Sequence, residues 1–151
     1  MIKKVFISLL ILFTIIPTVQ TFAAERTEEK MISYSKKFIG VPYRFGGTST
    51  SGFDCSGYTM HIYENFEKSL PRTSGSQYSV GNSVGKSELE VGDLVFFATS
   101  KSSKISHVGI YIGNQKFIHS QSNIGVSISN IDDPYYWGDR YVGAKRVADF
   151  K

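Results

Sequence analysis

The sequence predicts an α+β fold in which helices from the first half of the chain cover an antiparallel sheet formed by the second half. Helical spacing of apolar residues is confined to the first half, and short alternating runs separated by turn residues fill the second. The chain of 151 residues is long enough for one ordinary domain only. Hydrophobic residues make up 41% and charged residues 20%, which excludes a disordered chain.

The N-terminus has the pattern of a secretory signal peptide. Two lysines precede an apolar run over residues 5–16, and Ala23 and Ala24 offer small residues for cleavage. The run is too short for a membrane anchor, since spanning a bilayer takes about 20 apolar residues. We therefore expect a signal peptide over 1–23 and a mature domain over 24–151 that is secreted, extracellular or wall-associated, and free of the membrane.

The first half of the chain predicts two helices, a loop between them and a short helical turn. The first helix is expected from Thr27 to Ile39, because glutamates in its first turn suit the positive end of the helix dipole and Gly40 ends the run. A loop rich in Gly and Pro covers 41–53. The second helix is expected from about Cys55 to Phe66, and a helical turn from Ser74 to Val80.

The second half predicts five strands separated by turns, among them Gly113-Asn114. The expected strands are Leu94–Phe97, Ser106–Ile112, Lys116–Ser120, Val126–Ile128 and Tyr141–Val147. Between the last two, Trp137 is expected to have a packing role. The formal charge of +4 is modest and no basic run exceeds two residues, so charge gives no indication of a nucleic-acid partner.

The chain has one cysteine, Cys55, which cannot form an internal disulfide. Such a residue is commonly a small buried hydrophobe. Here Asp54 is a suitable N-cap, which places Cys55 in the first turn of the second helix. A helix N-terminus favours the thiolate and can lower the pKa of a cysteine, so this position is also typical of a nucleophile.

A base for that nucleophile is expected on the strand that carries His107. Val108, Ile110 and Ile112 alternate with the other residues and should face the core. His107 and Gly109 should then face the opposite side. The alternative for a single strand histidine is a residue that faces solvent.

Whether His119 can orient His107 depends on the length of the hairpin loop. A two-residue loop would put His119 on the core face, whereas a three-residue loop over 113–115 pairs it with Gly109 and puts it on the face of His107. The longer loop needs a positive φ at Gln115, which is not a residue type suited to it.

Three motifs together resemble the NlpC family of papain-like cell-wall cysteine peptidases. They are Phe53 to Gly57 (FDCSG), Ser106 to Tyr111 (SHVGIY) and Phe117 to His119 (FIH). Supporting matches are Pro42 to Gly47, Leu70 to Ser74, Gly92 to Phe97 and Tyr141 to Ala144. The resemblance covers essentially the whole mature chain, with one departure at Phe45, where the family usually has Trp.

The resemblance implies a papain-like fold and a triad of Cys55 as nucleophile, His107 as base and His119 as orienting group. It also implies substrate-binding or oxyanion roles for four residues: Tyr43, Asp54, Ser56 and Ser106. The implied reaction is hydrolysis of the bond from D-γ-glutamate to the diamino acid in peptidoglycan stem peptides, through an acyl-enzyme and without a cofactor or metal. We expect a monomer with peptidoglycan peptides as its partner and no nucleic acid.

Three alternatives differ in class. The first is a cell-wall amidase of the related Cys-His type, and the second is a non-catalytic wall-binding domain. The third is a zinc site built from Cys55, His107 and His119, which is disfavoured because these ligands are not in close-spaced pairs. The remaining histidine, His61, lies about 240° around the helix from Cys55 and is expected at the surface.

Overall fold

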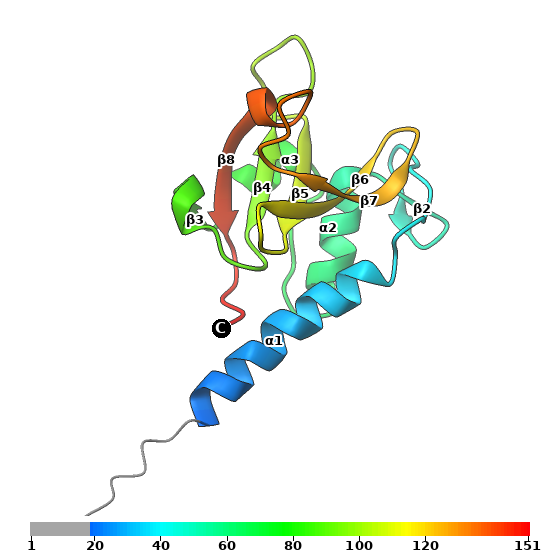
Figure 1. Ribbon diagram of the computed structural model, residues 1–151. Coiled ribbons are helices and arrows are strands. Elements are labelled where there is room, and N and C mark those ends of the chain that lie inside the picture. Colours follow the sequence, from blue (N-terminus) through cyan, green and yellow to red (C-terminus); the bar gives the residue numbers. More distant parts are fainter. Residues whose placement is uncertain (1–18) are drawn as a thin grey trace, which may run out of the picture.

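The computed structural model describes residues 19–151 (Figure 1). The predicted signal peptide therefore lies outside the described residues except for its last few, which form the start of the first helix. Between residues 19 and 151, no helix combines the length and the apolar character needed to cross a membrane.

Three α-helices precede the main sheet: α1 (Val19–Lys36), α2 (Cys55–Glu64) and α3 (Ser74–Tyr78). The start predicted for α1 at Thr27 is wrong, because residues 19–26 are already helical and extend away from the body of the domain (Figure 1). Glutamate is a good helix former at interior positions too, so acidic residues alone do not mark a helix start. After α1 the chain continues in turns to Gly40, which has a φ of 91°.

The starts of α2 and α3 are set by side-chain caps, as is common for helices. Asp54 accepts a hydrogen bond from the Gly57 N–H at 2.7 Å, and Thr73 accepts one from the Ser76 N–H at 3.2 Å. The predicted N-cap of the helix that carries Cys55 is therefore confirmed.

A six-stranded antiparallel sheet with the order β3-β8-β4-β5-β6-β7 forms the second layer. Its strands are β3 (Asn82–Val84), β4 (Leu94–Phe97), β5 (His107–Tyr111), β6 (Lys116–Gln121), β7 (Gly125–Asn130) and β8 (Tyr141–Arg146). Five of these agree with the predicted strands within two residues at each end. The remaining elements are a small ribbon of β1 (Thr48–Ser49) and β2 (Gly52–Phe53), and the 3₁₀ turns η1 (Lys86–Glu88) and η2 (Gly138–Arg140). The predicted α+β fold is confirmed.

Both faces of the sheet are covered. Phe96, Val108, Ile110 and Ile118 pack on one face with side chains of α1 and α2. On the other face, a second cluster contains Val95, Phe97, Phe117, Ile131, Trp137 and Ala144, and its last residues come from the segment around η2 and from β8. The face that carries His107 is therefore apolar and enclosed rather than open to solvent.

The hairpin between β5 and β6 has a three-residue loop, the longer of the two alternatives that the sequence left open. Its register pairs Ile110 with Ile118 and Tyr111 with Phe117, which continues to Gly109 opposite His119. Gln115 has a φ of 58° although it is not a glycine. Its backbone N–H donates to the Tyr111 hydroxyl at 3.1 Å and its carbonyl accepts from the Ile131 N–H at 2.8 Å. These two bonds offset the cost of the left-handed conformation.

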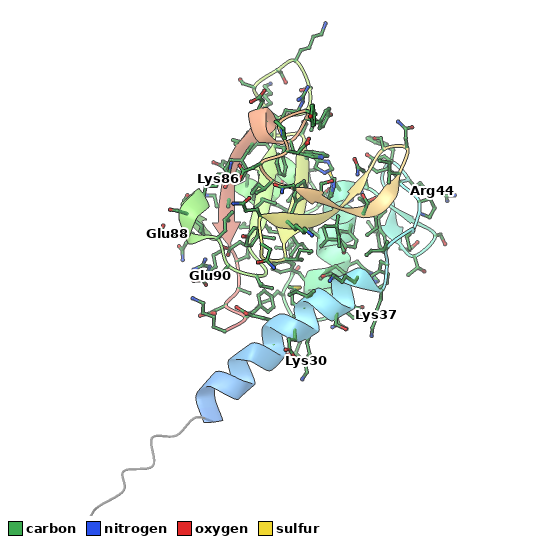
Figure 2. The ribbon with its side chains drawn as sticks, in the orientation of Figure 1. Lys30, Lys37, Arg44, Lys86, Glu88 and Glu90 are labelled. Carbon is green, nitrogen blue, oxygen red and sulfur yellow. The ribbon has the colours of Figure 1, made fainter. Side chains whose placement is uncertain are left out.

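Apart from the buried carboxylates of Asp54 and Asp93, most charged side chains lie at the periphery, away from these two clusters. Figure 2 shows Lys30 on α1, Lys37 just after its end, and Lys86, Glu88 and Glu90 near β3. Arg146 on β8 forms ion pairs near β3, with Glu90 at 3.1 Å and with the buried carboxylate of Asp93 at 2.8 Å. The distribution offers no continuous basic face among the labelled residues.

Candidate active site

The thiol of Cys55 lies where the N-terminus of α2 meets the start of β5. Its Sγ atom is 4.0 Å from the backbone oxygen of Ser106, and the side chain is 9% exposed. The Val108 backbone N–H also interacts with the thiol. The structure thus brings Cys55 against the backbone on either side of His107, although the two residues are far apart in the sequence.

The pKa of the Cys55 thiol is raised, which is opposite to the direction expected from its place at a helix N-terminus. Burial is the largest cause, and the Asp54 carboxylate adds to the rise. Backbone N–H groups of Val108, Ser56 and Cys55 lower the pKa but do not overcome burial. The dipole argument was wrong here because desolvation of a thiolate in a nearly closed site outweighs it.

His107 and His119 form a hydrogen-bonded pair, as the loop length predicts. His107 Nε2 lies 2.8 Å from His119 Nδ1, and His119 Nε2 lies 2.9 Å from the Ser129 hydroxyl. His107 is 7% exposed and His119 is completely buried. The sequence did not single out Ser129, and only the pairing of β6 with β7 could have indicated it.

Burial keeps both imidazoles neutral at physiological pH. It lowers the pKa of His107 to about 4 and holds the pKa of His119 well below its usual value, with the neighbouring His107 adding to the second shift. A neutral imidazole can accept a proton, so His107 is suited to the role of a base. A raised thiol pKa beside a lowered imidazole pKa favours a neutral resting pair over an ion pair.

Trp137 covers the two imidazoles. Its ring centroid lies 5.0 Å from that of His107 and 4.8 Å from that of His119. It also contacts Phe97 and Phe117, which pack against each other. The predicted packing role of Trp137 is confirmed, and this aromatic enclosure is the physical source of the desolvation of the histidine pair.

Asp54 connects three parts of the site through its carboxylate. Besides capping α2, it accepts from the Gly46 N–H at 3.0 Å, which holds the loop before β1. Both oxygens also accept from Arg72, at 3.0 and 2.5 Å, and Arg72 donates to the Ser56 hydroxyl at 2.9 Å. Arg72 belongs to a motif that supports the resemblance, but no site role was predicted for it.

Tyr43 and Ser106 lie near the thiol with different orientations. Burial raises the pKa of the Tyr43 phenol, and the charges of Cys55 and Asp54 add to the rise, which places this phenol within electrostatic reach of the thiol. The Ser106 hydroxyl instead accepts from the Thr99 N–H at 2.8 Å. The backbone carbonyl of Ser106, rather than its side chain, faces Cys55.

A pocket of about 380 Å³ lies on the His107 side of the site. Its lining is mainly polar and aromatic: Thr99, His107, Gln121, Ser122, Asn123, Tyr136 and Trp137. Phe45 is 92% exposed on the loop that Asp54 holds. The residue that departs from the family pattern therefore projects into solvent.

The prediction that His61 is a surface residue is wrong. The side chain is half-buried between α1 and α2, with ring centroids 4.8 Å from Phe38 and 5.0 Å from Phe53. The angular estimate considered α2 alone, whereas α1 and β2 cover this side of the helix. Over residues 19–151, no three His, Cys, Asp or Glu side chains gather closely enough to hold a metal ion.

Replacement of Asp54 by alanine is expected to lower the free energy of unfolding by about 2 kcal/mol. The variant loses the cap of α2, which contributes about 1 kcal/mol. It also loses the ion pair with Arg72, which adds about 1 kcal/mol because the Arg72 side chain is 40% exposed. Urea denaturation would measure it. Asp54→Asn is the matched control, because an amide oxygen can still cap the helix; equal stability of Asp54→Ala and the wild type would contradict this role.

Acidification is expected to destabilise the protein from about pH 6.5 to about pH 4. In this window the unfolded chain binds a proton at residue 107 that the folded protein excludes, because burial lowers the pKa of His107 to about 4. By linkage, the free energy of unfolding decreases as the pH is lowered. His107 alone accounts for about 3 kcal/mol of this decrease. Urea denaturation at pH 7 and pH 4 should show a smaller loss for His107→Gln than for the wild type, and an equal loss would refute the assignment.

A helix that begins with a cysteine and packs on a sheet carrying a buried histidine pair is the layout of a papain-like fold. Comparison with known proteins makes the assignment specific: residues 40–146 match the NlpC/P60 family, and the chain belongs to this family. The match runs from Gly40 to the end of β8 and includes Cys55, His107 and His119.

Several relatives share most of the described domain. The chain is 49% identical over 118 residues to a protein of Bacillus subtilis named probable peptidoglycan endopeptidase LytE, covering 78% of this chain and 34% of LytE. It is 45% identical over 109 residues to murein DD-endopeptidase MepS/murein LD-carboxypeptidase of Escherichia coli K12, covering 72% of this chain and 56% of MepS. The chain thus spans about a third to just over half of these relatives.

Solved structures of the family have the same fold. An NlpC/P60 family protein from Bacillus cereus superimposes with a TM-score of 0.73 at 41% identity, covering 80% of this chain and 40% of that chain. The NlpC/P60 domain of the peptidoglycan hydrolase SagA superimposes with a TM-score of 0.67 at 27% identity, covering 79% and 97%. The predicted papain-like fold of helices on an antiparallel sheet is therefore confirmed.

Proposed function

We propose that this protein is a secreted, monomeric cysteine peptidase that hydrolyses peptide bonds in the stem peptides of peptidoglycan. The observation that carries the proposal is the convergence of the Cys55 thiol with a buried, neutral histidine pair at one end of the sheet. The names of relatives such as LytE and MepS support peptidoglycan as the substrate. The signal-peptide pattern supports secretion.

The proposed mechanism begins with transfer of the thiol proton from Cys55 to His107. His107 Nε2 is engaged by His119, so Nδ1 is the nitrogen that receives the proton. The thiolate attacks the substrate carbonyl, and the backbone N–H of Cys55 with the Tyr43 hydroxyl stabilises the resulting oxyanion. His107 then protonates the leaving amine, and water hydrolyses the acyl-enzyme with His107 again as base.

The bond that we propose is the one from D-γ-glutamate to the diamino acid. The resemblance of the FDCSG, SHVGIY and FIH motifs to the family supports this choice, and Asp54, Ser56 and Arg72 beside the thiol offer charged and polar groups for the substrate. A second candidate is the peptide cross-link, because MepS, at 45% identity, is named a DD-endopeptidase and LD-carboxypeptidase.

The test is digestion of purified peptidoglycan by residues 24–151, with products identified by mass and the Cys55→Ala protein as the blank. New amino termini on the diamino acid, with stems that end in D-glutamate, would support the proposed bond. Cross-linked dimers converted to monomers would favour the second candidate. Free lactyl groups on the sugar would indicate an amidase, and unchanged walls with retained binding would indicate a non-catalytic wall-binding domain.

A further inference from the structure

We propose that Ser129 is a positioning residue whose hydroxyl accepts the Nε2 proton of His119 and so holds both imidazoles in the tautomers that let His107 act as a base. The inference rests on the proposed function, since it assumes that His107 receives the thiol proton. The three motifs place the site on α2, β5 and β6, and this inference adds a residue from β7.

The geometry of the sheet brings Ser129 to His119. β7 pairs Ser127 opposite His119 and Ser129 opposite Phe117. The His119 ring leans along β6 onto Phe117, with ring centroids 4.4 Å apart, so its Nε2 reaches the diagonal neighbour Ser129 at 2.9 Å. Among the hydrogen bonds of the described residues, each nitrogen of His119 has one partner, and these partners are His107 and Ser129.

The direction of the hydrogen bonds from His107 through His119 to Ser129 decides whether His107 can act as a base. In one direction, His107 donates from Nε2 to His119 Nδ1, and His119 donates from Nε2 to Ser129, which leaves His107 Nδ1 free to accept a proton. In the other direction, Ser129 donates to His119, His119 donates to His107, and the His107 proton sits on Nδ1. Only the first direction produces a base, and it requires Ser129 as an acceptor.

Burial makes the tautomer the important variable at this site. Both imidazoles are neutral near pH 7, because burial lowers their pKa values. Each ring then carries a single proton, and a neighbour must decide which nitrogen holds it. The side chain of Ser129 is half-buried, so its own hydroxyl proton can point to solvent while its lone pair accepts from His119.

Removal of the hydroxyl should shift the pair toward the inactive direction. In Ser129→Ala the active direction leaves a buried His119 N–H without a partner, which is unfavourable because the desolvation of that donor is no longer compensated. The reversed direction leaves only a bare acceptor, and proteins tolerate this somewhat better. We expect kcat to fall on the order of 10–100-fold, by analogy with loss of the hydrogen-bond partner of a metal-ligating histidine, with KM changed little.

The experiment combines histidine nitrogen NMR on the free protein with kinetics on peptidoglycan fragments. The chain has three histidines, and His61→Gln assigns the resonances outside the site. We expect the wild type to carry its protons on Nε2 of both His107 and His119. Ser129→Ala should increase the Nδ1-protonated form of His107, and Ser129→Thr, which keeps the hydroxyl, should restore the wild-type spectrum and rate.

Ser127→Ala is the matched control, since it removes a hydroxyl of β7 that accepts from Gln121 instead of an imidazole. A wild-type His119 protonated on Nδ1, or tautomers unchanged in Ser129→Ala, would overturn the inference. Equal spectral changes in Ser127→Ala would also overturn it, because the effect would then come from the strand. If no form of the protein hydrolyses peptidoglycan, the proposed function fails, while the spectra still decide the role of Ser129.

Discussion

A Cys55→Ala variant is expected to lose hydrolysis of peptidoglycan to the uncatalysed background, a fall on the order of 10⁶-fold in kcat. The chain contains no other cysteine, so no second thiol can replace the nucleophile. Without Sγ, no acyl-enzyme can form, and the histidine pair has no proton to receive. Release of soluble muropeptides, quantified by mass, measures the loss.

The control for this prediction is the stability of the variant, which shows whether Cys55→Ala still folds. The substitution removes one sulfur atom at a site that is 9% exposed, so the free energy of unfolding should change by about 1 kcal/mol only. Cys55→Ser, which restores a hydroxyl in place of the thiol, should remain far below the wild type, because a hydroxyl is a weaker nucleophile. Wild-type rates in a folded Cys55→Ala protein would reject Cys55 as the nucleophile.

A His107→Gln variant is expected to lower kcat/KM by about 10²–10⁴-fold, the usual contribution of a general base. Glutamine was chosen because its amide can still donate to His119 Nδ1, so the substitution removes the base and keeps the hydrogen bond that supports it. The raised pKa of the Cys55 thiol adds to the effect, since little thiolate forms at neutral pH without a base. Hydrolysis of a soluble muropeptide measures it.

Part of the lost rate should return at alkaline pH, where the thiol of the variant ionises without help. His61→Gln is the matched control: the same substitution is made at a half-buried histidine that packs against Phe38 and Phe53 instead of facing the thiol. We expect this control to keep its rate. Equal losses in the two variants would mean that the His107 effect comes from packing.

Local patterns were sufficient for the elements that carry the site. Asp54 before a helical stripe predicted the start of α2, and alternation around His107 predicted β5 and its two faces. These two predictions succeeded because caps and pleat alternation depend on residues that are close in the sequence. The sequence left two loop lengths open for the hairpin, and the structure has the three-residue loop, whose register places His119 beside His107.

Predictions failed where the environment of a side chain is set by segments that are distant in the sequence. The pKa of Cys55 moves upward because β5 and neighbouring residues bury the thiol, and nothing in the residues next to it shows this. His61 is covered by α1 and β2, so its exposure could not follow from its angle on α2. Both cases have the same physical cause, since desolvation and packing are set by whichever distant segment covers the residue.

By itself, the sequence determined the α+β order of elements, the position of Cys55 at a capped helix start, the strand histidines and the resemblance to a family of wall peptidases. Only the tertiary structure decided three contacts. Ser129 hydrogen-bonds to His119, Arg72 joins Asp54 and Ser56, and Trp137 shields the two imidazoles from water. The reason is distance along the chain: these contacts join β6 to β7, α2 to the segment before α3, and the sheet to the segment around η2. Such contacts depend on how separate elements pack, and no local spacing encodes them.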